Sequence, residues 1–283
     1  MRFMSFENKG APGLAVAGAD GEFHGLLASD EGFPGTLDEI VRSGDLNQAA
    51  AALGAGDKID ADSVNFQVPL AKPGKVLCIG LNYADHAAES KMEAPDFPTV
   101  FARFASGFVP HGAPLVRPAI SDKFDYEGEM VAVIGKKGRN ISEENALDHV
   151  VGYSIFNDGS IRDYQVRTPQ WTVGKNFDGT GGFGPVFVTA DELPAGGAGL
   201  HIETRLNGEV MQSASTSDLM FDVRRLVSLL SSAMTLEPGD IIVTGTPSGV
   251  GFARKPPVFM KPGDVCEVEV EKIGTLRNEV IAE

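Results

Sequence analysis

The sequence predicts an α+β protein rich in β-strands, in which a small N-terminal αβ domain precedes a larger domain. After residue 75, most apolar runs are short and carry strand patterns, and few segments show the helical period. Residues 69–74 contain two prolines and a glycine, which disfavour both helices and strand pairing. We therefore predict domains at residues 1–70 and 71–283. With 42% hydrophobic residues, a chain of 283 residues can bury a full core.

The predicted helices follow from capping residues and apolar spacing. Thr36 and Glu39 have the spacing of a capping box, so a short helix is expected to begin there in the N-terminal domain. A second short helix follows and is expected to stop at Gly54. In the larger domain, Asp222 can cap a longer helix, because apolar residues recur at helical spacing over residues 223–234.

Two strand patterns and one further helix complete the outline of the larger domain. Asn207 and Gly208 lie between two strand-like runs and predict a hairpin turn. Residues 266–270 alternate apolar side chains with glutamates, as expected for a strand with one buried face and one wet face. Asn82 can cap residues 83–91 as a helix.

Charge and composition exclude several classes of function. The formal net charge of -15 disfavours nucleic acids and anionic membranes as partners, since both need clustered Lys and Arg. No apolar stretch approaches the length of a membrane span, and the first residues lack a secretory pattern. Cys78 and Cys266 are in no metal-like spacing and are expected to be reduced and buried. These observations predict a cytoplasmic protein that acts on a small molecule.

The strongest chemical signal is a group of carboxylates. In Asp125-Tyr-Glu127-Gly-Glu129, residues two apart share one face of an extended strand, where like charges repel unless a cation lies nearby. The alternative is a solvated acidic edge. A second apolar run ends at Asp158, which supplies a third carboxylate at a strand terminus. Three carboxylates suit a hard cation such as Mg²⁺, Mn²⁺ or Ca²⁺.

With these motifs in view, the sequence resembles the fumarylacetoacetate hydrolase superfamily over roughly residues 75–280. The resemblance is carried by Glu127-Gly-Glu129, Asp158, residues 171–178, Asn207-Gly208 and residues 244–251. It implies a mixed β-roll, a homodimer, and Mg²⁺ or Mn²⁺ bound by Glu127, Glu129 and Asp158. Enzymes of this family cleave, decarboxylate, isomerise or hydrate 2-oxo acids and acylpyruvates.

Three further residues are catalytic candidates. His86 and Glu89 are i, i+3 on the predicted helix and share a face; a lone histidine is more often a surface or core residue. The resemblance implies that this pair activates water. Lys175 follows a glycine without the spacing of a phosphate-binding loop, so it is not a nucleotide lysine. The resemblance implies that Lys175 neutralises charge on a substrate enolate.

Substrate-binding candidates lie in three segments. Arg162 and Gln165 follow the third carboxylate, and similar positions in the family bind substrate oxygens. Asn82 and Tyr83 belong to the segment that resembles the family's lid. Thr246 either holds the substrate 1-carboxylate, as the resemblance implies, or stabilises a turn.

One motif is rejected and two departures are noted. Gly179-Thr-Gly181-Gly-Phe-Gly184 fits a dinucleotide-binding pattern, but a strand-like run follows where a helix is required. Many family members have lysine at the position of Arg103, which affects an expected substrate contact. Many have a larger residue at the position of Gly159, whose glycine is expected to loosen the loop.

The resulting functional prediction is a Mg²⁺- or Mn²⁺-dependent hydrolase that cleaves a C–C bond in an acylpyruvate or 2,4-dioxo acid. The same enolate intermediate serves an oxaloacetate decarboxylase or a keto-enol isomerase, which are the alternatives within enzymes. A catalytically inactive, metal-stabilised binding protein is the alternative outside enzymes.

Overall fold

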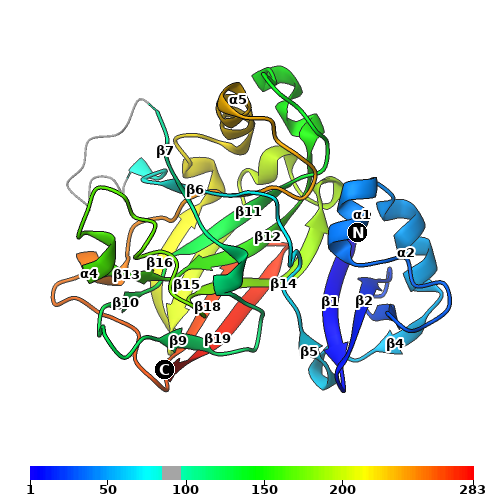
Figure 1. Cartoon of the computed structure of the whole chain (residues 1–283), viewed down its shortest axis with the longest axis horizontal. Helices are drawn as coiled ribbons and strands as arrows, with labels where there is room; N and C mark the ends of the chain where they lie inside the picture. The colour runs from blue at the N-terminus through cyan, green and yellow to red at the C-terminus, as the bar shows by residue number, and fades with distance from the viewer. Residues whose placement is uncertain (85–96) are drawn as a thin grey trace.

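The structure is a computed structural model that describes residues 1–84 and 97–283 (Figure 1). Within these residues, a 12-stranded mixed sheet and a 5-stranded sheet form the body of the molecule, beside a two-stranded ladder. The predicted α+β class, rich in strands, is confirmed.

The strands of the large sheet follow the order β4 (Asp57–Ile59), β3 (Phe23–Leu27), β2 (Ala11–Ala17), β1 (Arg2–Asn8), β14 (Gly181–Thr189), β12 (Val150–Asp158), β11 (Gly128–Ile134), β17 (Ile241–Val243), β6 (Val76–Gly80) and β7 (Thr99–Ala102), with β5 (Asn65–Phe66) paired to β1 and β8 (Phe108–Val109) to β14. The second sheet has the order β16 (Glu209–Ser215), β15 (His201–Leu206), β18 (Val265–Val270), β19 (Gly274–Ala282) and β9 (Leu115–Arg117), and the ladder pairs β10 (Phe124–Asp125) with β13 (Ser160–Ile161). The helices of the described residues are α1 (Leu37–Ser43), α2 (Leu46–Gly54), α4 (Arg162–Gln165) and α5 (Val223–Ala233), with short 3-10 segments η1 (Ala61–Ser63), η2 (Ala105–Gly107), η3 (Glu143–His149), η4 (Ala190–Glu192), η5 (Ala195–Gly197), η6 (Thr216–Asp218) and η7 (Gly251–Ala253).

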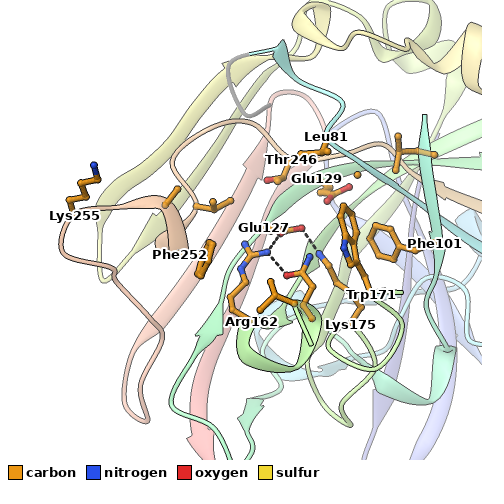
Figure 2. A pocket seen from close by; sticks show the side chains of 16 residues that line it. Leu81, Phe101, Glu127, Glu129, Arg162, Trp171, Lys175, Thr246, Phe252 and Lys255 are labelled. Carbon is orange, nitrogen blue, oxygen red and sulfur yellow. Dashed lines mark hydrogen bonds and ion pairs between the residues drawn. The ribbon is translucent and has the colours of Figure 1, made fainter. Parts of the chain in front are cut away.

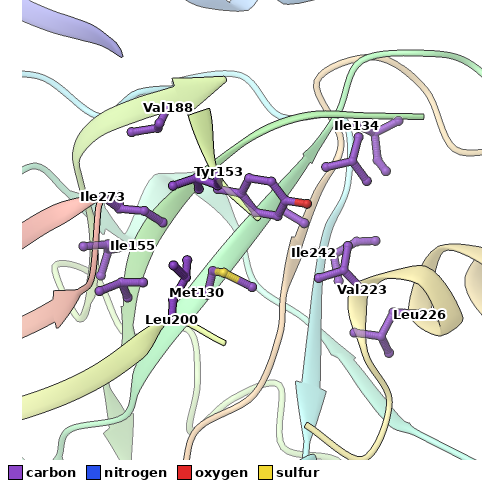
Figure 3. Close-up of a cluster of buried hydrophobic side chains, with 14 of the residues drawn as sticks. Met130, Ile134, Tyr153, Ile155, Val188, Leu200, Val223, Leu226, Ile242 and Ile273 are labelled. Carbon is purple, nitrogen blue, oxygen red and sulfur yellow. The ribbon is translucent and has the colours of Figure 1, made fainter. Parts of the chain in front are cut away.

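Strand β11 lies in the middle of the large sheet and separates two cores. Its neighbours β12 and β17 are both antiparallel to it. Met130, Ala132 and Ile134 belong to the core shared with the second sheet and α5 (Figure 3). Val131 and Val133 belong to the core on the opposite face, which includes residues of α1 and α2. Because side chains alternate along a strand, the odd-numbered side chains of β11 point away from the second sheet.

The N-terminal strands extend the large sheet, because β1 pairs with β14 through Arg2 opposite Val188 and Phe3 opposite Phe187. Helix α1 has the predicted capping box, in which Thr36 and Glu39 exchange hydrogen bonds. Helix α2 ends at Gly54, as expected. Residues 69–74 form no regular element, and the domain boundary predicted there stays a prediction.

Several local predictions in the larger domain are confirmed. Asn207 and Gly208 connect β15 to β16 with positive φ angles, and Asp222 caps α5 by accepting from the backbone N–H of Arg225. Strand β18 buries every second residue. Both cysteines are buried and free. None of the helices among the described residues is long and apolar enough to cross a membrane.

Candidate metal-binding active site

The three predicted carboxylates come together where two central strands meet. Glu127 directly precedes β11, Glu129 lies within it, and Asp158 ends β12. One carboxylate oxygen from each lies within 4.8 Å of the other two. The residues are only 5%, 1% and 0% exposed, respectively. This burial excludes the solvated acidic edge and leaves a compact, anionic set of oxygen donors.

Gly128 makes this convergence possible. A Cβ at this position would lie 2.1 Å from Thr204 Oγ1 and 2.9 Å from Val268 Cγ1, both on the second sheet. Because no side chain fits there, only glycine lets β11 approach the second sheet so closely. The two flanking glutamates then both point to the other face of the strand.

Three basic side chains surround the carboxylates, and Figure 2 shows two of them, Arg162 and Lys175, beside Glu127. Lys175 Nζ lies 2.6 Å from Glu127 Oε2 and 2.6 Å from Asp158 Oδ2. Arg162 Nη1 lies 2.6 Å from Glu127 Oε1, and Arg103 Nη1 lies 2.5 Å from Asp158 Oδ1. Lys175 thus bridges carboxylates from both strands, which places a positive charge between them.

Glu129 differs from the other two carboxylates. Its Oε2 accepts a hydrogen bond from the backbone N–H of Gly245, and no basic side chain of residues 1–84 or 97–283 forms an ion pair with it. Burial, followed by the charges of Asp158 and Glu127, raises the pKa of Glu129 well above its ordinary value. Burial lowers the pKa of Lys175, but the same two carboxylates outweigh it and the net shift is upward. Lys175 therefore stays charged, whereas no basic side chain of the described residues neutralises Glu129.

The donor set fits a hard divalent ion. Carboxylate oxygens are the ligands that Mg²⁺ and Mn²⁺ prefer, whereas soft metals prefer sulfur. Glu127, Glu129 and Asp158 would hold such an ion, and its charge would relieve the repulsion that raises the pKa of Glu129.

A cavity of about 590 Å³ opens above the carboxylates. Glu127 and Glu129 line it, and Trp171 and Phe101 form one wall with their ring centroids 5.5 Å apart (Figure 2). A Cβ on Gly80 would lie 2.3 Å from the Trp171 ring, so the indole packs directly on the backbone of β6. The cavity thus combines a charged floor with an aromatic wall, as small-molecule sites commonly do.

The structure places three of the predicted substrate contacts and Lys175 in this cavity. Arg162, Gln165, Thr246 and Lys175 all line it. Arg162 Nη1 also donates to Gln165 Oε1 at 2.8 Å, while its buried Nη2 has no hydrogen-bond partner among residues 1–84 and 97–283. The Thr246 hydroxyl donates to the carbonyl of Gly128 at 3.0 Å, so it also stabilises the local backbone. Their substrate-binding roles stay predictions.

The other candidates lie elsewhere. The Asn82 side chain donates to the carbonyls of Phe221 and Thr244 and accepts from the backbone of Phe221, so it joins loops and does not cap a helix with these bonds. The Tyr83 hydroxyl is buried and has no hydrogen-bond partner in the described part of the chain. Neither residue lines the cavity. His86, Glu89 and most of the helix predicted over residues 83–91 lie outside the described residues.

Two departures from the family pattern now have a structural context. Arg103 does not line the cavity; its guanidinium bonds Asp158, the carbonyl of Gly159 and the hydroxyl of Thr180. A Cβ on Gly159 would lie 2.1 Å from the carbonyl oxygen of Thr180. The backbone is therefore closely packed at Gly159, and the expected loosening of the loop stays a prediction. The rejected glycine-rich pattern leads into strand β14, as predicted.

The sequence analysis assigned no role to three neighbours of the site, although it included Asp125 in the acidic motif. Trp171 and Phe101 form the aromatic wall, although the sequence placed them only inside longer motifs. Asp125 is fully buried and pairs with Arg162, with an Oδ2–Nε distance of 2.7 Å. Its position two residues before Glu127 was a usable signal, because a strand continued to Asp125 would put both on one face.

Comparisons with known sequences support the resemblance. The family model described as "Fumarylacetoacetate (FAA) hydrolase C-terminal" matches residues 75–281. The "Oxaloacetate tautomerase fahd2, mitochondrial" of Xenopus laevis is 38% identical over 290 residues, which cover 99% of this chain and 90% of that protein.

Two solved structures show the same fold. The fumarylacetoacetate hydrolase from psychrophilic Exiguobacterium antarcticum has a TM-score of 0.87 and 38% identity, with 100% of both chains covered. The maleylpyruvate hydrolase from Sphingobium sp. SYK-6, in complex with manganese(II) and pyruvate, has a TM-score of 0.81 and 27% identity, with 100% of this chain and 99% of that chain covered.

Proposed function

The chain belongs to the fumarylacetoacetate hydrolase family, and on that premise we propose that it interconverts the keto and enol forms of a short 2-oxo acid, with oxaloacetate as the first substrate to test. The observation that carries this proposal is the convergence of Glu127, Glu129 and Asp158 beside Lys175 at the floor of one cavity. Enolisation builds negative charge on the 2-oxo oxygen, and a fixed cluster of cations lowers the cost of that charge.

Each residue of the site has a distinct proposed role. Mg²⁺ or Mn²⁺, held by the three carboxylates, would supply Lewis-acid polarisation of the 2-oxo group. Lys175 stays protonated in its anionic surroundings, so it can donate a hydrogen bond to the developing oxyanion. Arg162 offers the buried Nη2 to a substrate oxygen, and Gln165 fixes the Arg162 guanidinium through Nη1.

The proton on carbon 3 of the substrate needs a general base. We propose His86 for this role, oriented by Glu89, as in the dyad that the sequence predicts; both lie outside the described residues. A neutral imidazole is a competent base near neutral pH. Trp171 and Phe101 give the cavity an apolar wall beside its charged floor, and this wall would limit the access of water to a bound substrate.

Hydrolysis of a C–C bond in an acylpyruvate is the second candidate. The leaving pyruvate enolate would be stabilised by the same carboxylate-bound metal and Lys175. The manganese- and pyruvate-bound maleylpyruvate hydrolase of the same fold favours this reading. The name of the Xenopus laevis relative, a protein of higher identity, favours tautomerisation. Decarboxylation of oxaloacetate is a third use of the same enolate.

Three assays on one preparation separate these activities. Purified protein with Mn²⁺ is mixed with enol-form oxaloacetate and with acetylpyruvate, and the loss of enol absorbance and the release of pyruvate are followed. Faster enol loss without pyruvate supports the proposal. If pyruvate is released only from acetylpyruvate, the protein is a hydrolase. If pyruvate is released from oxaloacetate, it is a decarboxylase. A protein inactive in all three assays with Mn²⁺ or Mg²⁺ contradicts the proposal.

Assembly and location are separate proposals. A homodimer follows from the family resemblance, and light scattering on the purified protein tests it. The cytoplasmic location expected from the sequence stays a prediction, because the name of the Xenopus laevis relative places that protein in mitochondria.

A further inference from the structure

Asp125 is a buried carboxylate beside the site that accepts four hydrogen bonds from the described residues. It is 0% exposed and lies at the end of β10, opposite Ser160 of β13. Its Oδ2 accepts from Arg162 Nε at 2.7 Å and from the backbone N–H of Phe252 at 2.9 Å. Its Oδ1 accepts from the backbone N–H groups of Gly251 at 2.8 Å and of Tyr126 at 2.9 Å.

These contacts decide between two roles for a carboxylate so close to the predicted metal ligands. A carboxylate offers about four lone-pair positions, and Asp125 uses all four on protein donors. We propose that Asp125 is a positioning residue that holds Arg162 and the η7 turn together as one wall of the cavity, and that it is not a fourth metal ligand.

One oxygen of Asp125 holds both parts of this wall. Arg162 Nε and the N–H of Phe252 share the same oxygen of Asp125, so losing that oxygen frees both the guanidinium and the turn. The Phe252 ring also lies over the guanidinium, 5.9 Å from its carbon atom to the ring centroid. Arg162 and Phe252 both line the cavity. Asp125 therefore acts on a ligand only through the groups that it anchors.

The backbone around Asp125 brings the two anchored elements to it. The N–H of Arg162 donates to the carbonyl of Lys123, and the N–H of Met260 donates to the carbonyl of Phe124, so β10 lies between α4 and the chain that follows η7. A Cβ on Gly251 would lie 1.7 Å from the carbonyl oxygen of Val258 and 2.6 Å from Asp125 Oδ1, so only glycine lets the turn pack between them.

The inference rests on the proposed function in one respect: the anchored arginine is expected to bind a 2-oxo acid beside the metal. Oxalate, a stable dicarboxylate, serves as the probe for this class of ligand. Titration calorimetry measures its binding to the Mn²⁺-loaded protein. Asp125→Asn should weaken oxalate binding about tenfold, because a charged hydrogen bond to Arg162 is lost. Mn²⁺ should still bind to this variant with the wild-type stoichiometry. In an Arg162→Met background, Asp125→Asn should have no further effect on oxalate.

Asp163→Asn is the matched control, because it removes a neighbouring carboxylate charge. Asp163 Oδ1 accepts from the Ser121 hydroxyl at 2.6 Å, and the residue does not line the cavity. Its oxalate affinity should equal that of the wild type. Should Asp125→Asn fail to fold, Asp125→Glu keeps the charge but is one methylene too long to serve all four donors. It should show the same loss of oxalate affinity.

A second readout does not depend on any ligand. Hydrogen exchange of the Gly251 and Phe252 amides should accelerate in Asp125→Asn and stay unchanged in Asp163→Asn. Wild-type oxalate affinity in both Asp125 variants would overturn the inference. It would also be overturned if Asp125→Asn weakened oxalate binding by the same factor in the Arg162→Met background as in the wild type. Loss of Mn²⁺ stoichiometry in Asp125→Asn would make the residue a ligand instead. If the wild type binds Mn²⁺ but not oxalate, the proposed function fails, and amide exchange alone decides the role of Asp125.

Discussion

Replacing Lys175 with methionine removes the positive charge that bridges the two strands of the site. Its Nζ lies 2.6 Å from both Glu127 Oε2 and Asp158 Oδ2, and the residue is 1% exposed. Removing one partner of a buried ion pair costs roughly 3–5 kcal/mol. Arg162 and Arg103 still pair with the same carboxylates, so we expect the lower end, about 3 kcal/mol, in metal-free protein. For a chain of 283 residues, that loss corresponds to a decrease in Tm of roughly 5 °C.

Urea unfolding with EDTA, and again with saturating Mn²⁺, measures this effect. The added cation should restore part of the lost stability, so the gap between Lys175→Met and wild type should shrink with Mn²⁺. Lys75→Met is the control: Lys75 Nζ lies 2.6 Å from Asp240 Oδ2, away from the site, and its loss should not respond to metal. A gap for Lys175→Met below about 1 kcal/mol in EDTA, or one that Mn²⁺ leaves unchanged, would refute this reasoning.

Four further perturbations test other parts of the site. Glu127→Gln should abolish turnover and leave the circular dichroism spectrum unchanged, and normal turnover would contradict the site assignment. Gly128→Ala should cost roughly 1–3 kcal/mol in unfolding free energy and lower Mn²⁺ affinity, because its Cβ would meet Thr204 at 2.1 Å. Gly80→Ala should shift the emission of Trp171, the single tryptophan, and raise KM; an unchanged spectrum would count against the aromatic wall. Finally, the raised pKa of Glu129 means that metal-free protein should lose stability as pH rises from 4.5 through the folded pKa, and urea titrations in EDTA that show stability rising there would oppose this account.

Local patterns in the sequence predicted local structure well. The capping box at Thr36 and Glu39 and the hairpin turn at Asn207 depend on contacts within a few residues, and both are present. The paired glutamates were predictable for the same reason, because strand periodicity alone puts them on one face.

Contacts between distant segments were harder to predict. The pairing of β1 with β14 joins residues more than 180 positions apart, and no local pattern indicates it. The several donors to Asp125 come from α4 and from η7, so its role depends on where those elements pack. The fit of Gly159 against Thr180 likewise depends on tertiary packing, which no local pattern indicates.

The central claim is that three carboxylates converge to hold one hard divalent cation. Titration calorimetry of metal-free protein with Mn²⁺, on wild type and on Glu129→Gln, tests it most directly. Glu129 is the carboxylate without an ion pair among the described residues, so its neutral substitute should cost metal affinity without breaking a salt bridge. We expect one Mn²⁺ per chain in the wild type and a strongly weakened or absent signal in the variant. Equal uptake by both proteins, or none by the wild type, would contradict the account.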